Sequence, residues 1–258
     1  MKIYLQILLY FLLISCNSVK KTANVKILNQ NFEVKLDSAN WYDTSRKRLI
    51  PVAFYLPKKN GKIINQKLVL FSHGYAENIP GANKGYSYLT KKLASKGYFV
   101  VSIQHELPTD DLIPKTGIPQ VVRRPNWERG AENILFVLNE LKKINPDLDY
   151  KHLILIGHSN GGDMSVLFAH KYPDLVDKII SLDNRRMELP RTSHPKIYSL
   201  RSSDQPADEG VLPTVAEQEK FGITIIKLPN TIHNVMSDRG NKKQKREIND
   251  YVMRFLLE

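Results

Sequence analysis

The stretch that decides the fold reads His152-Leu153-Ile154-Leu155-Ile156-Gly157-His158-Ser159-Asn160-Gly161. Its apolar run predicts a buried strand, and residues 163–170 are expected to lie in a helix. The glycines permit a tight turn between the two elements, which would hold Ser159 in a strained, exposed position. Gly-x-Ser-x-Gly alone is a weak pattern, but strand, turn and helix together are the setting of a nucleophilic serine. The alternatives are a glycine-rich turn that binds phosphate and a merely structural turn.

Short apolar runs alternate with helical patterns on both sides of this stretch, which predicts βαβ units and a mostly parallel sheet. Residues 68–71 are continuously apolar, as in a strand covered on both faces. Further strands are expected at 98–103, 179–182, 197–200 and 224–228, antiparallel edge strands at 32–36 and 52–55, and helices at 86–95, 127–141 and 244–257. Residues 107–125 contain four prolines and are expected to form a long loop.

A serine hydroxyl is a poor nucleophile until a base removes its proton. In folds of this kind the base follows the last strand, and His233 lies five residues beyond Leu228. This position favours His233 as the base over a solvated loop histidine.

Two backbone N–H groups are needed to hold the oxyanion that forms during attack on a carbonyl. The N–H of Asn160, directly after the serine, is the first candidate. The second is the N–H of Tyr75, in the loop Ser72-His73-Gly74-Tyr75 that follows an expected strand. We expect His73 to hold this loop through its ring nitrogens.

The acid that orients His233 has two candidates. Asp183 ends the strand expected at 179–182, and Asp204 follows the strand expected at 197–200. Spacing alone favours Asp204, whereas Asp208 and Glu209 are expected to be solvated loop charges.

The composition is that of a folded globular protein: 258 residues, 42% hydrophobic, 25% charged, with a formal net charge of +12. One cysteine excludes a disulfide scaffold and an all-cysteine metal site. The histidines lack metal-binding spacing, and no nucleotide-binding pattern is present. We therefore expect no metal, no cofactor and no nucleic-acid partner.

The N-terminus reads as a secretory signal, because Lys2 precedes an apolar run at 3–14 that is too short to span a bilayer. Its end, Leu13-Ile14-Ser15-Cys16, resembles the bacterial lipobox, in which the cysteine is acylated. The alternatives are an ordinary signal peptide and a buried strand with a chance cysteine. The expected organisation is a lipoprotein signal peptide at 1–16, a tether at 17–24 and a single domain at 25–258. Lipid would then anchor the protein in the bacterial cell envelope, on the extracytoplasmic side.

Several segments between about residues 43 and 238 carry a more specific resemblance. They are Phe71-Ser72-His73-Gly74, residues 93–100, His105-Glu106, residues 123–133 and 157–162, Leu182-Asp183 with Met187 and Leu189-Pro190, and residues 231–234 with Asp238. Together they resemble the platelet-activating-factor acetylhydrolase and predicted dienelactone hydrolase group of the α/β-hydrolase superfamily. The resemblance implies an α/β-hydrolase fold and shifts the preference for the acid from Asp204 to Asp183.

The leading functional hypothesis is a serine hydrolase that cleaves small-molecule carboxylic esters, short-acyl or lipid-derived, through an acyl-enzyme. We expect it to act as a monomer. The alternatives are an amidase or peptidase of the same fold and a non-catalytic binding lipoprotein.

Overall fold

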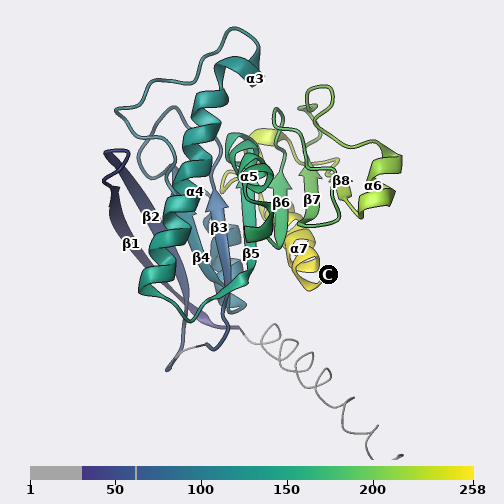
Figure 1. Ribbon diagram of the computed structural model, residues 1–258. Helices are drawn as coiled ribbons and strands as arrows, with labels where there is room; N and C mark the ends of the chain where they lie inside the picture. The colour runs from purple at the N-terminus through teal and green to yellow at the C-terminus, as the bar shows by residue number, and fades with distance from the viewer. Residues whose placement is uncertain (1–30, 62) are drawn as a thin grey trace, which may run out of the picture.

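An eight-stranded sheet forms the centre of the structure, a computed structural model that describes residues 31–61 and 63–258. The strands are β1 (Glu33–Asp43), β2 (Arg48–Lys58), β3 (Lys67–Ser72), β4 (Phe99–Ile103), β5 (Asp149–His158), β6 (Lys178–Leu182), β7 (Lys196–Arg201) and β8 (Thr224–Lys227). Their order is β1-β2-β4-β3-β5-β6-β7-β8 (Figure 1). β3 to β8 are parallel, and the β1–β2 hairpin is antiparallel at one edge. The predicted mostly parallel sheet is confirmed.

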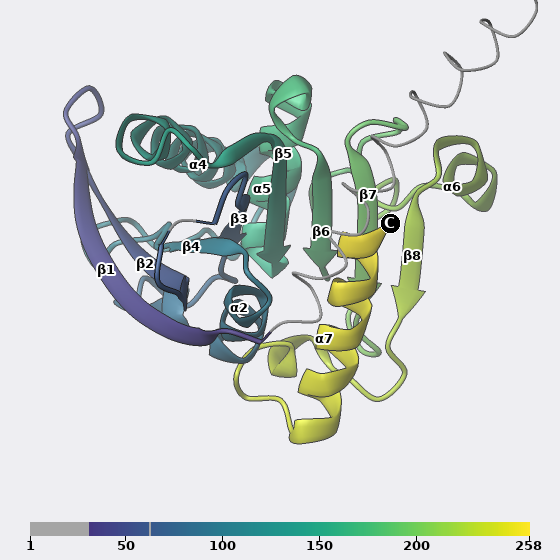
Figure 2. The ribbon, with the colours of Figure 1, turned by 90° about the horizontal axis from the view of Figure 1, so that it is seen from below.

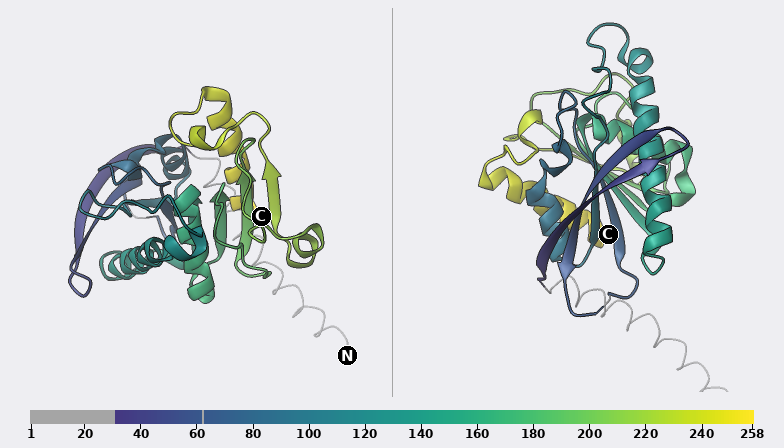
Figure 3. Two further views of the ribbon diagram at one scale, coloured as in Figure 1. Left: turned by 90° about the horizontal axis from the view of Figure 1, so that it is seen from above. Right: turned by 90° about the vertical axis from the view of Figure 1, so that its left-hand side faces the viewer.

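Helices cover both faces of the sheet (Figures 2 and 3). They are α2 (Ser87–Ser95), α3 (Pro119–Val122), α4 (Arg124–Ile144), α5 (Ser159–Lys171), α6 (Val215–Phe221) and α7 (Lys242–Leu257), with short 3₁₀ turns at Ala82–Lys84, Pro173–Leu175 and His233–Val235. Successive residues of β3 point to opposite faces. Leu68 and Leu70 join the core with α4 and α5, whereas Val69 and Phe71 join the core with α2 and α7. Burial on both faces explains the uninterrupted apolar run of this strand.

The β1–β2 hairpin is longer than the sequence predicted, because each strand has 11 residues. β1 is an edge strand whose side chains are mostly solvent-exposed. The polar–apolar alternation of residues 33–37 breaks at Ser38, a polar residue at an apolar position, so the pattern did not reveal the full length of the strand. The expected antiparallel pairing is confirmed, but only β1 is an edge strand, because β2 pairs with β1 on one side and with β4 on the other.

The prediction of an unbroken loop at residues 107–125 is wrong, because α3 lies inside this segment and α4 begins at its end. Pro119 and Pro125 were interpreted as loop residues, but each lies at one of the first two positions of a helix. A proline is tolerated there because the N–H that it lacks would have no partner within the helix. Helix α6 was not predicted; it begins with a capping box between Thr214 and Glu217.

The carboxyl ends of the parallel strands and the loops that follow them form one edge of the sheet, where a ligand site is expected in folds of this type. In residues 31–61 and 63–258, no helix has the length and hydropathy needed to cross a membrane. The predicted signal peptide at 1–16, Cys16 and the tether at 17–24 lie outside the described residues.

Candidate active site

Ser159 lies in the sharp turn between β5 and α5, as the first residue of that helix. Its φ of 51° is in the left-handed region, which is strained for a residue with a side chain. The turn is tight: a Cβ atom on Gly157 would lie 2.4 Å from the carbonyl oxygen of Gly161. The two glycines of the motif therefore allow a turn that presents the serine at the edge of the sheet.

His233 begins the 3₁₀ turn after β8, and its ring lies between a hydroxyl and a carboxylate. Its Nε2 is 2.8 Å from Oγ of Ser159, and its Nδ1 is 2.6 Å from Oδ2 of Asp183. An ionised carboxylate can only accept hydrogen bonds, so Nδ1 of His233 carries the proton and donates a hydrogen bond to Asp183. In this tautomer Nε2 is free to accept the hydroxyl proton of Ser159.

Asp183 follows β6 directly, has a φ of 59° and is fully buried. Its Oδ1 forms an ion pair of 2.9 Å with Nη2 of Arg201 and accepts the N–H of Ser202 at 3.0 Å. Burial raises the pKa of the Asp183 carboxyl, but the hydrogen bond from His233, the charge of Arg201 and the hydrogen bonds from Ser202 together lower it below its usual value. Asp183 therefore stays ionised near neutral pH.

Asp204 also contacts His233, but at the backbone. Its Oδ1 accepts the N–H of His233 at 2.7 Å, and its side chain is exposed. The structure thus brings both candidate acids to His233 and gives each a different partner atom. Asp183 directly follows β6 and its carboxylate reaches the ring of His233, whereas Asp204 lies farther along the loop after β7.

The two predicted oxyanion donors come from the start of α5 and from the loop after β3. Asn160 is the second residue of α5, so its N–H has no acceptor within the helix. Its side chain is held at both ends: Oδ1 accepts from Nε1 of Trp127, and Nδ2 donates to Glu106 and Asn126. Tyr75 lines the same cleft as Ser159, and no backbone carbonyl of the described chain accepts its N–H.

His73 holds the loop that carries Tyr75. Its Nδ1 lies 2.8 Å from the carbonyl oxygen of Gly74, and its Nε2 accepts the N–H of His105 at 3.1 Å. These contacts match the structural role that the sequence predicted. Within the described ranges, no group of three His, Cys, Asp or Glu side chains could hold a metal ion.

A cleft of about 610 Å³ opens above Ser159 and His233. Its walls come from the loops after β3 and β8 and from the start of α2, and many of the lining residues are small, including Gly74, Ala76, Gly81, Ala82 and Gly85. The cleft has room for a small organic substrate whose carbonyl reaches the Ser159 hydroxyl.

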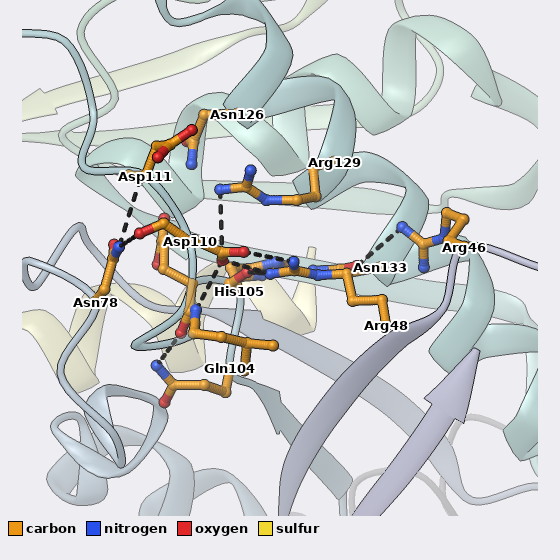
Figure 4. Close-up of polar contacts among 12 residues, drawn as sticks. Arg46, Arg48, Asn78, Gln104, His105, Asp110, Asp111, Asn126, Arg129 and Asn133 are labelled. Atoms are coloured by element: carbon orange, nitrogen blue, oxygen red, sulfur yellow. Dashed lines mark hydrogen bonds and ion pairs between the residues drawn. The ribbon is translucent and has the colours of Figure 1, made fainter. Parts of the chain in front are cut away.

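The loop after β4 is fixed to the scaffold through the carboxylate of Asp110 (Figure 4). This carboxylate accepts hydrogen bonds of 2.7 Å from both terminal nitrogens of Arg48, and Arg129 lies 3.6 Å away. Arg48 also donates to the carbonyl oxygen of His105 at 2.7 Å. Arg48 belongs to β2, far away in the sequence, so no local pattern marks this contact. The anchored loop carries Glu106, which holds Asn160.

Two further residues at the site were missed by sequence reasoning. Arg201 could have been suspected from one weak signal in the sequence. It is a basic residue at the end of β7, and the neighbouring strand β6 is followed by the acid Asp183. Nothing in the sequence marks Tyr86, because its hydrogen-bond partners, Gly74 and His158, are distant in the chain.

The chain matches the family described as alpha/beta hydrolase fold over residues 67–254, and it belongs to that family. No curated protein matches its sequence. Its structure is similar to a fungal esterase from Rhizomucor miehei (TM-score 0.64, 13% identity, 93% of this chain and 89% of that chain). It is also similar to EstE1, a thermophilic carboxylesterase from a metagenomic library (0.62, 13%, 93% and 93%), and to an esterase from the archaeon Pyrobaculum calidifontis (0.59, 13%, 91% and 86%). The predicted fold is therefore confirmed.

Proposed function

We propose that the protein is a serine hydrolase that cleaves carboxylic esters through an acyl-enzyme. The observation that carries this proposal is the continuous chain of hydrogen bonds from Ser159 through His233 to Asp183. Family membership and the esterases among the similar structures support it.

In this mechanism His233 takes the hydroxyl proton as Ser159 attacks the ester carbonyl. The negative charge that develops on the carbonyl oxygen is held by the N–H groups of Tyr75 and Asn160. Protonated His233 is stabilised by Asp183 and gives its proton to the leaving alcohol. Water, activated by the same histidine, then releases the acyl group from Ser159.

The substrate class that fits best is a short-acyl or lipid-derived ester. The cleft of about 610 Å³ is open and walled by small residues. The sequence resemblance to the platelet-activating-factor acetylhydrolase and dienelactone hydrolase group points in the same direction.

The test is a fluorophosphonate label on purified protein, followed by p-nitrophenyl esters of increasing acyl length. We expect the wild type to be labelled and a folded Ser159→Ala variant to stay unlabelled, because the label needs an activated hydroxyl. Labelling of Ser159→Ala at the wild-type rate would refute the assignment of the nucleophile. Matched p-nitroanilide substrates distinguish an esterase from an amidase.

We also propose, from the sequence, that Cys16 is acylated and that the lipid anchors a monomeric enzyme in the bacterial envelope, facing the extracytoplasmic side. The test is metabolic labelling with a tagged fatty acid. We expect incorporation into the wild type and none into Cys16→Ala, and equal incorporation into both would reject the lipobox.

A further inference from the structure

A buried run of hydrogen bonds joins three segments of the candidate site through Tyr86 and His158. The hydroxyl of Tyr86 accepts the N–H of Gly74 at 3.1 Å and lies 2.7 Å from Nδ1 of His158. The other ring nitrogen of His158, Nε2, is 3.1 Å from the carbonyl oxygen of His233. The side chains are only 6% and 5% exposed, so water does not replace these contacts.

The chemistry of the partners sets the direction of every bond. A carbonyl oxygen only accepts, so Nε2 of His158 carries the proton and donates it to His233. Nδ1 is then an acceptor and takes the hydroxyl proton of Tyr86, whose oxygen remains free to accept the N–H of Gly74. One neutral tautomer of His158 therefore allows all three hydrogen bonds to form at once, with Gly74, Tyr86 and His233 as partners. Burial, with a smaller contribution from His233, lowers the pKa of His158 to about 3, which keeps the ring neutral.

The side chains of this run are also closely packed. The ring centroids of His158 and His233 are 4.7 Å apart, and those of Tyr86 and His158 are 5.5 Å apart. A Cβ atom on Gly74 would lie 2.7 Å from Nδ1 of His158 and 3.0 Å from the hydroxyl of Tyr86. Position 74 therefore requires glycine because these two side chains fill the space beside it.

Each end of this run adjoins a group that the proposed reaction uses. Gly74 precedes Tyr75, whose N–H is the proposed oxyanion donor, and its own N–H is already engaged by Tyr86. His158 precedes Ser159, and the carbonyl that it contacts belongs to His233, the proposed base. The run thus connects the oxyanion loop, the nucleophile turn and the base.

We propose that Tyr86 and His158 are positioning residues, which hold the N–H of Tyr75 and the ring of His233 in fixed places around Ser159. This inference rests on the proposed serine hydrolase function. Displacing a reacting group by about 1 Å can cost about 10²-fold in rate. Loss of the run should therefore lower kcat more than it changes KM.

The central variant is Tyr86→Phe, which removes the hydroxyl and keeps the ring. The matched control is Tyr98→Phe, because Tyr98 is a buried tyrosine in the same apolar core and outside the cleft. With a neutral p-nitrophenyl ester, we expect Tyr86→Phe to lower kcat about 10- to 100-fold, with KM within about threefold of wild type. Tyr98→Phe should keep the wild-type kcat, and thermal melts establish that both variants are folded.

A second pair of variants tests His158 itself. His158→Gln keeps one donor and one acceptor in a planar group, whereas His158→Leu keeps neither. We expect the glutamine variant to retain at least about tenfold more of the wild-type kcat than the leucine variant, since only glutamine can bridge Tyr86 and His233.

A spectroscopic measurement tests the run without relying on activity. In protein with ¹⁵N-labelled histidine, His158 should show a protonated Nε2 and an unprotonated Nδ1 at neutral pH, and the Nδ1 shift should move in Tyr86→Phe. The inference is overturned if Tyr86→Phe keeps the wild-type kcat, or if His158 has the opposite tautomer. Absence of fluorophosphonate labelling in the folded wild type would reject the proposed function, and with it the positioning role.

Discussion

The loops after β6 and β7 each bring a carboxylate to His233, and they build it into different surroundings. Asp183 is fully buried, contacts the ring at 2.6 Å and is paired with Arg201. Asp204 is exposed and accepts the backbone N–H of His233 at 2.7 Å. Both residues satisfy the same sequence criterion, an acid shortly after a strand; spacing alone favours Asp204, whereas the family resemblance favours Asp183.

The difference follows from what each contact has to do. A carboxylate that fixes the tautomer of a buried imidazole is itself removed from water, and it stays ionised only with compensating donors. Arg201 and the N–H of Ser202 provide that compensation. A carboxylate that only receives a backbone N–H at the surface needs no such partner. The presence of a buried cation therefore marks the acid that orients the histidine.

The largest effect is expected from Asp183→Asn. The amide has one acceptor oxygen where the carboxylate has two, and it carries no charge to stabilise the imidazolium, so the ring loses its tautomer or orientation. In a serine protease with a Ser-His-Asp triad, replacing the triad aspartate by asparagine lowers kcat about 10⁴-fold. We expect a loss of roughly 10²- to 10⁴-fold in kcat with little change in KM.

Steady-state kinetics on the ester panel measure this loss, with Asp204→Asn as the matched variant. Both proteins must first melt cooperatively near the wild-type temperature. A large loss in Asp204→Asn with a near-wild-type Asp183→Asn would reverse the roles assigned to the two loops.

The next effect concerns stability. Arg201→Gln leaves the Asp183 carboxylate buried without its cation, and removal of one partner from a buried ion pair costs about 3–5 kcal/mol. We expect that decrease in the free energy of unfolding, measured by chemical denaturation. In the double variant Asp183→Asn/Arg201→Gln, the loss of unfolding free energy should be smaller than the sum of the losses in the two single variants. The reason is that no buried carboxylate is then left without its cation. Strict additivity would show that Arg201 does not act through Asp183.

Substitution of Asp204 should have a smaller effect on kcat than substitution of Asp183. Asp204→Ala removes the acceptor for the N–H of His233, and a hydrogen bond of this kind contributes about 1 kcal/mol. We expect kcat to fall roughly fivefold, the equivalent of that energy. Asp204→Asn retains an acceptor oxygen and should stay within about twofold of wild type. Equal losses in the two variants would point to the charge of Asp204 rather than to its hydrogen bond.

The smallest expected effect is on acid stability. The pKa of Asp183 is lower in the folded protein than its ordinary value, so its contribution to stability is complete above the ordinary value and is lost as pH falls through the folded value. The difference in melting temperature between wild type and Asp183→Asn should therefore be constant down to about pH 5 and shrink as the pH falls further. A difference that stays constant below about pH 5 would contradict the lowered pKa of Asp183 in the folded protein.

The sequence by itself determined the features that depend on neighbouring residues. The apolar run of β5 and the two glycines around Ser159 act within a few residues, so the strand, the turn and the exposed serine follow from local preferences. The chain order of this fold, with the base after the last strand, pointed to His233. The continuous apolar runs indicated which strands are buried on both faces. The polar edge strand β1 and the start of α4, which contains Pro125, were predicted less well, because neither shows a clear period.

Only the tertiary structure decided which distant side chains meet. Asp183 and His233 are 50 residues apart, Arg48 and Asp110 are 62 apart, and Tyr86 and His158 are 72 apart. Each pair forms because strand ends and loops from distant parts of the chain meet at the same edge of the sheet. Hydrophobic periodicity encodes which face of an element is buried, but it carries no information about the direction of a loop side chain. The choice between Asp183 and Asp204 therefore depended on the packed positions of β6, β7 and the loop after β8.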